Sequence, residues 1–145
     1  MKKKLLYLLP ALALLAVGCL KTVSDIPKQA LPAGKFTGQF RLLHRSTNTV
    51  PYDTLKCNLT LTIGGSGNTY TVTGDTATLH AGSNGTYGIS SPFISFVDNT
   101  YPASGTPTKT HLNGVYQFYY DGNVFQMLAT ASDTLALQYD MKKSQ

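Results

Sequence analysis

The chain contains no tryptophan and no glutamate, and only two of its 145 residues are cysteines. Catalysis by paired carboxylates needs two acids held side by side, and only seven aspartates are available here. Six of them are expected in turns, where Asp hydrogen-bonds its own backbone, or at strand ends and outward positions: Asp75, Asp121, Asp133, Asp53, Asp98 and Asp140. We therefore expect no enzymatic activity.

Histidine is scarce as well, and each of the three stands alone in sequence. A metal site requires His, Cys or carboxylates at short, set spacings, which His44, His80 and His111 do not have. We expect three solvated imidazoles, with His111 on the outward side of its strand, and neither a metal nor another cofactor. Cys57 occupies an alternating apolar position, so we expect a small buried hydrophobic residue there.

Positive charge is concentrated at the start of the chain. Twelve basic and seven acidic residues give a net charge of +5, but removing Lys2, Lys3 and Lys4 leaves nine basic residues and a charge near +2. No cluster of Lys or Arg then remains to attract a polyanion. The composition argues against nucleic-acid binding.

The three lysines lead into an apolar run from Leu5 to Val17. Its thirteen residues are too few to span a bilayer, which takes about 20, so residues 1–18 are expected to be a cleaved signal peptide. Leu15-Ala16-Val17-Gly18-Cys19 resembles the bacterial lipobox, with Ala16 where Leu is usual. The resemblance implies a lipid such as palmitate on Cys19. The alternative is an ordinary secretory signal that leaves a free thiol.

A lipidated Cys19 would anchor the protein to a membrane of the cell envelope. Leu20 follows it in place of the Asp that retains lipoproteins in the inner membrane, so we expect the outer membrane, with the exposed face left open. Residues 19–32 contain two prolines and no apolar period, which is typical of a tether. Residues 33–143 then form one domain.

This domain has the composition and the patterning of an all-β protein. Thr, Tyr, Phe and Val are abundant, and turn residues recur about every ten positions. In 55–63 every odd residue is apolar and polar residues intervene, which predicts a strand with one wet face. Similar patterns predict eight strands, the sixth starting near His111. Gly64-Gly65-Ser66-Gly67-Asn68 is expected to be a turn rather than a phosphate-binding loop.

Eight antiparallel strands with short connections favour an up-and-down β-barrel, because closure buries the apolar faces and removes the sheet edges. A Greek-key sandwich is the alternative, although it needs longer crossing connections.

The domain also resembles the lipocalin-like lipoproteins of Bacteroidetes-type bacteria, small relatives of the calycin barrels. The resemblance rests on five stretches: Gly34-Lys35-Phe36, Gly85-Thr86-Tyr87-Gly88-Ile89, Ile94-Ser95-Phe96, Leu112-Asn113-Gly114-Val115-Tyr116 and Tyr139-Asp140-Met141-Lys142-Lys143. Phe36 replaces the Trp that opens such barrels, and no helix follows the last strand. The resemblance implies the barrel and names no ligand.

The candidate ligand-binding residues are those expected to line the barrel: Phe40, Tyr70, Tyr87, Phe96, Tyr116, Phe118 and Met127. An eight-stranded barrel is either filled by its own side chains or holds one small ligand. Buried tyrosine hydroxyls need partners, which a polar-lined cavity would supply, unless they reach out through the barrel ends.

Two hypotheses for function follow. In the first, the barrel binds a small apolar or amphipathic ligand. In the second, a filled barrel acts through its surface or loops as a binding or structural module with an envelope protein partner. A cavity containing a His and an Asp within hydrogen-bond reach would favour a third, enzymatic, function.

Overall fold

The computed structural model describes residues 30–64 and 67–144. Residues 1–18, Cys19 and most of the expected tether lie outside this part, as do Gly65 and Ser66 of the expected glycine-rich turn. Eight strands account for the domain: β1 (Gly34–His44), β2 (Asp53–Ile63), β3 (Thr69–Gly74), β4 (Ser83–Ser90), β5 (Phe93–Asp98), β6 (Gly114–Tyr120), β7 (Val124–Ser132) and β8 (Leu135–Lys143).

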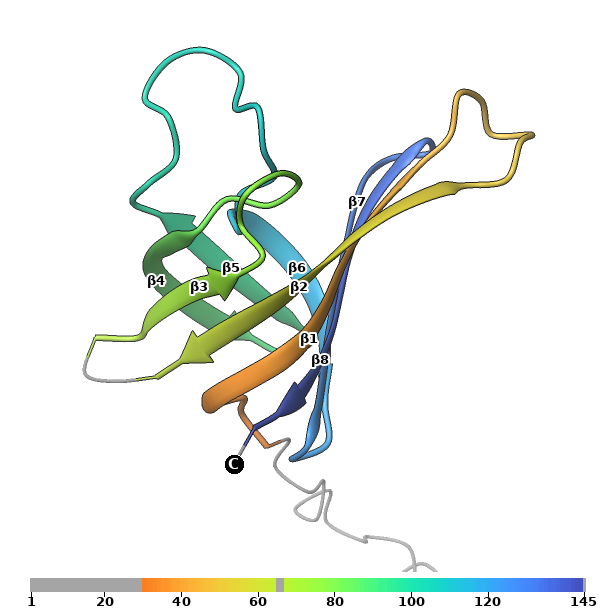
Figure 1. The fold of residues 1–145 in the computed structure, drawn as a ribbon. Coiled ribbons are helices and arrows are strands. Elements are labelled where there is room, and N and C mark those ends of the chain that lie inside the picture. Colours follow the sequence, from red (N-terminus) through yellow and green to blue (C-terminus); the bar gives the residue numbers. More distant parts are fainter. Residues whose placement is uncertain (1–29, 65–66, 145) are drawn as a thin grey trace, which may run out of the picture.

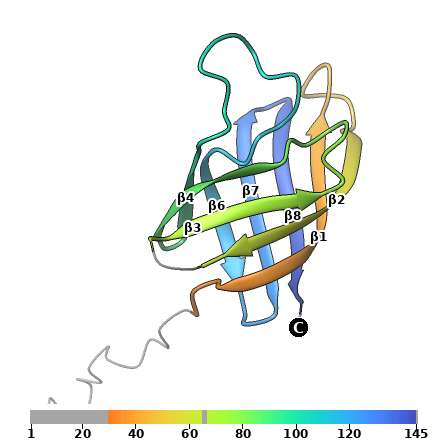
Figure 2. The same ribbon diagram turned by 60° about the vertical axis from the view of Figure 1, so that its left-hand side comes forward.

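The strands form a closed antiparallel barrel in sequence order, as Figures 1 and 2 show. Each strand pairs with the next, and β8 returns to pair with β1, so that Phe40 lies opposite both Cys57 and Tyr139. The up-and-down barrel is therefore confirmed over the sandwich. Within the described residues no helix is long and apolar enough to cross a membrane.

Alternation along the strands directs one set of side chains into the barrel. Even-numbered residues of β1 and odd-numbered residues of β2 point inward, among them Phe36, Phe40, Leu59 and Leu61, all 3% exposed or less. The described core lies wholly within residues 34–143. Because the barrel closes on itself, this segment holds the contacts it needs to fold alone.

Two glycines allow neighbouring strands to approach closely. A Cβ on Gly38 would lie 2.0 Å from the Asp140 carbonyl oxygen, and one on Gly85 would lie 1.9 Å from that of Val97. No side chain fits at either distance. Glycine at such points is how a strand bends around a small barrel.

The two ends of the barrel differ. One end is closed by short turns such as Asp121-Gly122-Asn123, where Asp121 Oδ1 accepts hydrogen bonds from the backbone N–H groups of Asn123 and Val124. The other end carries the longer connections 45–52, 75–82 and 99–113, of which 45–52 and 99–113 project beyond the strands in Figure 2. We call this end the mouth.

Two expectations about β5 and β6 were wrong. Asp98 does not face outward: it continues the inward series of Ile94 and Phe96 and is 7% exposed. The sixth strand begins at Gly114 rather than near His111, because the φ of Gly114 is +96°, outside the extended region. His111 to Asn113 consequently belong to the mouth.

Candidate functional site

The interior of the barrel is occupied by its own aromatic rings. Tyr139 packs against Phe40 at 4.9 Å between centroids and against Tyr116 at 5.6 Å, and Phe96 continues the contact toward Tyr70. A second group of rings fills the end opposite the mouth: Phe36, Phe118, Tyr120 and Phe125.

The residues expected to line the barrel do point inward. Six are buried, at 5% exposed or less, and Tyr87 is partly buried against the same core. They contact one another and their neighbours, and their part in ligand binding stays a prediction.

The connection 75–82 closes the mouth side of this interior. It places His80 wholly inside, where the ring lies 4.9 Å from that of Phe40. Nδ1 lies 2.6 Å from the Ala81 carbonyl oxygen and Nε2 lies 2.8 Å from the Tyr139 hydroxyl. Since a carbonyl can only accept, Nδ1 carries the proton and Nε2 accepts from Tyr139. Burial lowers the pKa of His80 to about 4, so the ring is neutral.

The long connection 99–113 is hydrogen-bonded to the connection 75–82. The Ala81 N–H donates to the Thr110 carbonyl at 2.8 Å, and the Thr110 N–H donates to that of Leu79 at 3.0 Å. Lys109 Nζ donates to the Thr76 carbonyl at 2.9 Å. These hydrogen bonds join the two connections into one layer across the mouth.

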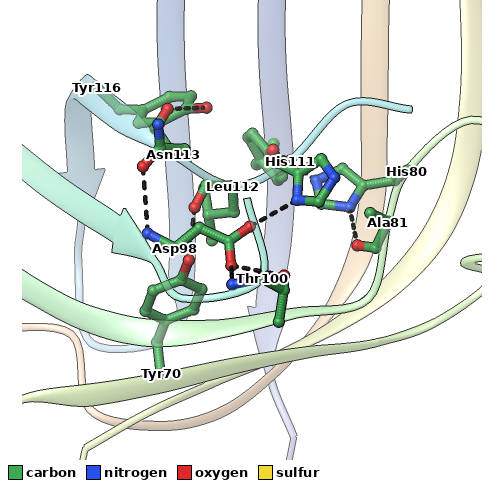
Figure 3. A network of polar contacts seen from close by, with 10 residues as sticks. Tyr70, His80, Ala81, Asp98, Thr100, His111, Leu112, Asn113 and Tyr116 are labelled. Atoms are coloured by element: carbon green, nitrogen blue, oxygen red, sulfur yellow. Dashed lines mark hydrogen bonds and ion pairs between the residues drawn. The ribbon is translucent and has the colours of Figure 1, made fainter. Parts of the chain in front are cut away.

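A buried carboxylate and an imidazole anchor that layer to β5. Asp98 Oδ2 lies 2.7 Å from His111 Nδ1, and the two side chains are 0% and 10% exposed. Asp98 Oδ1 accepts from both the N–H and the hydroxyl of Thr100, as Figure 3 shows. Asp98 thus fixes the His111 ring with Nδ1–H toward the carboxylate.

The other nitrogen of His111 remains available. Nε2 has no hydrogen-bond partner among the described residues, and the side chain of His111 is 10% exposed. Tyr101 packs edge-on against the ring at 5.3 Å. The result is an oriented imidazole with one open nitrogen.

His111 lines a pocket of about 470 Å³, which we call the mouth pocket. Four leucines make up its apolar lining, and its polar lining comes mainly from the long connection. Its residues are Leu42, Thr78, Leu79, Tyr101, Pro107, Thr108, Lys109, Thr110, His111, Asn113, Leu135 and Leu137. A volume of this size fits a small molecule.

The buried tyrosines are satisfied by the protein itself. The Tyr70 hydroxyl donates to the Leu112 carbonyl at 2.6 Å, and that of Tyr120 to the Gly122 carbonyl at 2.8 Å. Burial raises the pKa of Tyr116 to about 12 and that of Tyr139 well above its usual value. Burial also raises the pKa of Tyr70, and the nearby hydroxyl of Ser83 offsets part of that rise. This buried hydroxyl has no partner in hydrogen-bond geometry among the described residues.

The histidine expectation was correct only at His44, which is half exposed beside Asp53. His80 and His111 are buried or nearly so, and both are hydrogen-bonded. Strand parity already placed Asp98 on the inward face, and this signal was missed. For His80 the only hint was an apolar neighbour, Leu79, in an otherwise polar connection.

Cys57 is buried as expected, and burial raises the pKa of its thiol. Across residues 30–64 and 67–144, no group of three or more His, Cys, Asp or Glu side chains is placed to hold a metal ion. Comparison of the chain with protein-family models, curated proteins and solved structures gave no significant match. The function must therefore be argued from this geometry.

Proposed function

We propose that the protein is a lipid-anchored lipoprotein of the cell envelope, similar to lipocalin-like lipoproteins, whose barrel binds one small amphipathic molecule at its mouth. The observation that carries the proposal is the mouth pocket, whose lining combines four leucines with an imidazole oriented by a buried carboxylate. Apolar walls with a few fixed polar groups are typical of small-molecule sites.

The mouth is a better place for a ligand than the deeper interior. Below the leucines the rings are already in contact, and Phe40, Tyr116 and Tyr139 are 1% exposed or less. A ligand that entered further would have to displace His80 and break its bond to Tyr139. Of the predicted lining residues, we therefore assign Phe40 and Tyr116 to the packed surface beneath the ligand.

The envelope anchor agrees with the direction of the barrel. Strand β1 begins at Gly34, at the end opposite the mouth in Figure 2. A lipid on Cys19 would place that end nearer the membrane. The mouth would then open away from the bilayer, where a ligand can reach it.

Native mass spectrometry tests the proposal on the chain from Leu20 to Gln145, incubated with a lipid-containing extract of envelope. We expect a discrete added mass of roughly a few hundred daltons, the size of a small ligand. Tyr101→Ala and Leu135→Gln, which alter the mouth pocket, should lose it, and Tyr119→Ala, on the outside of β6, should keep it.

Two other outcomes would overturn the mouth as the site. An added mass that survives both pocket variants but disappears in Phe118→Ala would locate the ligand in the interior. The absence of any added mass from a stable, folded protein would support the second hypothesis, a filled barrel that binds an envelope protein partner through its surface.

One observation favours a second function, general-base catalysis. His111 Nε2 is open while Nδ1 is held by Asp98, the arrangement of a base with its orienting carboxylate. Nε2 could take a proton from a water that adds to a bound ester and return it to the departing alcohol. Hydrolysis of short acyl esters, abolished in His111→Gln and retained in His44→Gln, would support this; no hydrolysis above buffer would exclude it for such esters.

A further inference from the structure

The outer wall of β6, β7, β8 and β1 carries an ordered grid of polar side chains. These strands are neighbours in the barrel and lie side by side in Figure 2. Their pairing aligns outward residues in two rows, each read from β6 to β1: Gln117, Leu128, Gln138 and Arg41, then Tyr119, Gln126, Asp140 and Gln39.

Part of this grid is hollowed into a groove of about 330 Å³. Its outward side chains are those of Gln117, Tyr119, Gln126, Leu128 and Gln138, and we call it the outer groove. Tyr119 is 54% exposed and Leu128 is 44% exposed. The groove thus combines an open phenol ring, an apolar patch and three amides.

Asp140, the outward neighbour of Gln126 on β8, orients the amides. Gln126 Nε2 donates to Asp140 Oδ1 at 2.9 Å, and Gln138 Nε2 donates to Oδ2 at 3.2 Å. A carboxylate only accepts, so both amide NH₂ groups must face it and both Oε1 atoms must face away. Two carbonyl acceptors are therefore fixed before any ligand arrives, which reduces the entropy cost of binding.

The charges at this site cancel. Arg41 Nη1 lies 2.6 Å from Asp140 Oδ2, and none of the described residues that line the groove is charged. An ionic ligand would find no counter-charge here. A purely apolar ligand would cover amides without replacing their hydrogen bonds to water, which costs free energy.

We propose that the outer groove binds a neutral saccharide. Sugar hydroxyls both donate and accept, which suits the fixed carbonyls of Gln126 and Gln138 and the amide of Gln117. The C–H face of a sugar ring can pack on the ring of Tyr119 and on Leu128. The site is separate from the mouth pocket, with which it shares no residue.

Isothermal titration calorimetry tests this with the chain from Leu20 to Gln145 and neutral trisaccharides of glucose, mannose, galactose and xylose. At least one should bind, and Tyr119→Ala should weaken it by about tenfold through loss of the ring contact. Tyr119→Phe keeps the ring and should bind nearly as well. Tyr101→Ala, which removes an exposed tyrosine at the mouth, should change nothing.

Asp140→Asn probes the orientation of the amides separately. An asparagine can donate as well as accept, so Gln126 and Gln138 are no longer forced into one orientation. We expect weaker binding and an unchanged circular dichroism spectrum.

The proposal is overturned if none of the four sugars binds, or if Tyr119→Ala binds as tightly as the parent chain. A concentration-dependent dimer in sedimentation, lost in Tyr119→Ala, with no response to sugar, would also overturn it and identify a second copy of the chain as the occupant.

Discussion

The ionisation of His80 is tightly coupled to folding. Its ring is fully buried between Phe40 and Tyr139, and both nitrogens are used by neutral partners. Cys57 is also close, and Asp98 and His111 act on it from a distance. A proton on Nε2 would place a charge on a ring that no carboxylate contacts among the described residues.

We therefore predict that stability falls as pH falls from about 6.5 to about 4. In this window an unfolded His80 takes up a proton, whereas the folded pKa of about 4 keeps the ring neutral. The loss should be on the order of 3 kcal/mol, and it should level off below pH 4. Urea unfolding at a series of pH values measures it.

Two variants isolate this effect. His80→Asn should be less stable than the parent at pH 7, because Tyr139 loses its acceptor, but its stability should depend less on pH. His44→Gln removes an exposed histidine and should keep the parent dependence. An unchanged slope in His80→Asn would show that another group controls acid unfolding.

We expect Asp98 to contribute to the free energy of unfolding about as much as His80 does. Replacement of Asp98 by Ala leaves the Thr100 N–H and His111 Nδ1 without their acceptor in a buried place. We predict a loss of about 3 kcal/mol or more in the free energy of unfolding, since removing one partner of a buried pair is costly. Asp133→Ala, in an exposed turn, should cost far less by the same urea measurement; equal losses would contradict the role given to Asp98.

For single residues, the sequence predicted which side of a strand a side chain occupies better than it predicted which residue that side chain contacts. Alternation placed Tyr116 and Phe118 inward correctly, because each strand has a fixed period of two. Asp98 and His111 lie thirteen positions apart, and nothing in their local pattern shows that the intervening connection folds back. Contacts between connections depend on the closed barrel, which local periodicity does not describe.

At the scale of the strand, Gly85 sets how closely β4 and β5 can approach. An added methyl group would meet the Val97 carbonyl oxygen at 1.9 Å, so the two strands would have to separate. We predict that Gly85→Ala costs about 3 kcal/mol or more, the upper range for overpacking.

Gly88 offers a matched control on the same strand. There an added Cβ would meet only the Ser95 hydroxyl, at 3.2 Å, and that side chain can rotate away. Thermal unfolding should show a small change for Gly88→Ala beside a large one for Gly85→Ala. Similar shifts for both would mean that close approach of the strands is not what selects glycine.

The strands were predictable as elements, and their limits were less so. The odd-numbered apolar residues of β2 define that strand almost completely. Leu112 is buried and has the same parity as the inward residues of β6, which is why the start of this strand was misplaced. The strand begins only at Gly114, whose φ is positive. Apolar parity therefore shows which residues are buried, and backbone angles decide where a strand begins.

For the whole molecule, the buried tyrosines predict an upper pH limit to the stability of the fold. Burial raises the pKa of Tyr70, Tyr116 and Tyr139 above the value of about 10 that an unfolded phenol has. The stability they contribute is complete below pH 10 and is lost as pH rises above it, because only the unfolded chain then ionises.

We expect the three buried tyrosines to ionise only on unfolding. Their tyrosinate absorbance should therefore appear together with the loss of the β-sheet circular dichroism signal, in one transition above pH 10. Tyr116→Phe should make the alkaline transition shallower, since one of the shifted phenols is gone. Ionisation of the buried phenols while the β-sheet signal is intact would show that the interior admits hydroxide without unfolding.

The pairing of β1 with β8 also determines when, during synthesis, the barrel can close. The last strand to be synthesised is a direct neighbour of the first, so almost the entire domain must be present before the ring of hydrogen bonds can be completed. Such long-range closure makes folding slow. If the chain is exported, it can cross the membrane still open and close only on the far side, once Leu135 to Lys143 have arrived.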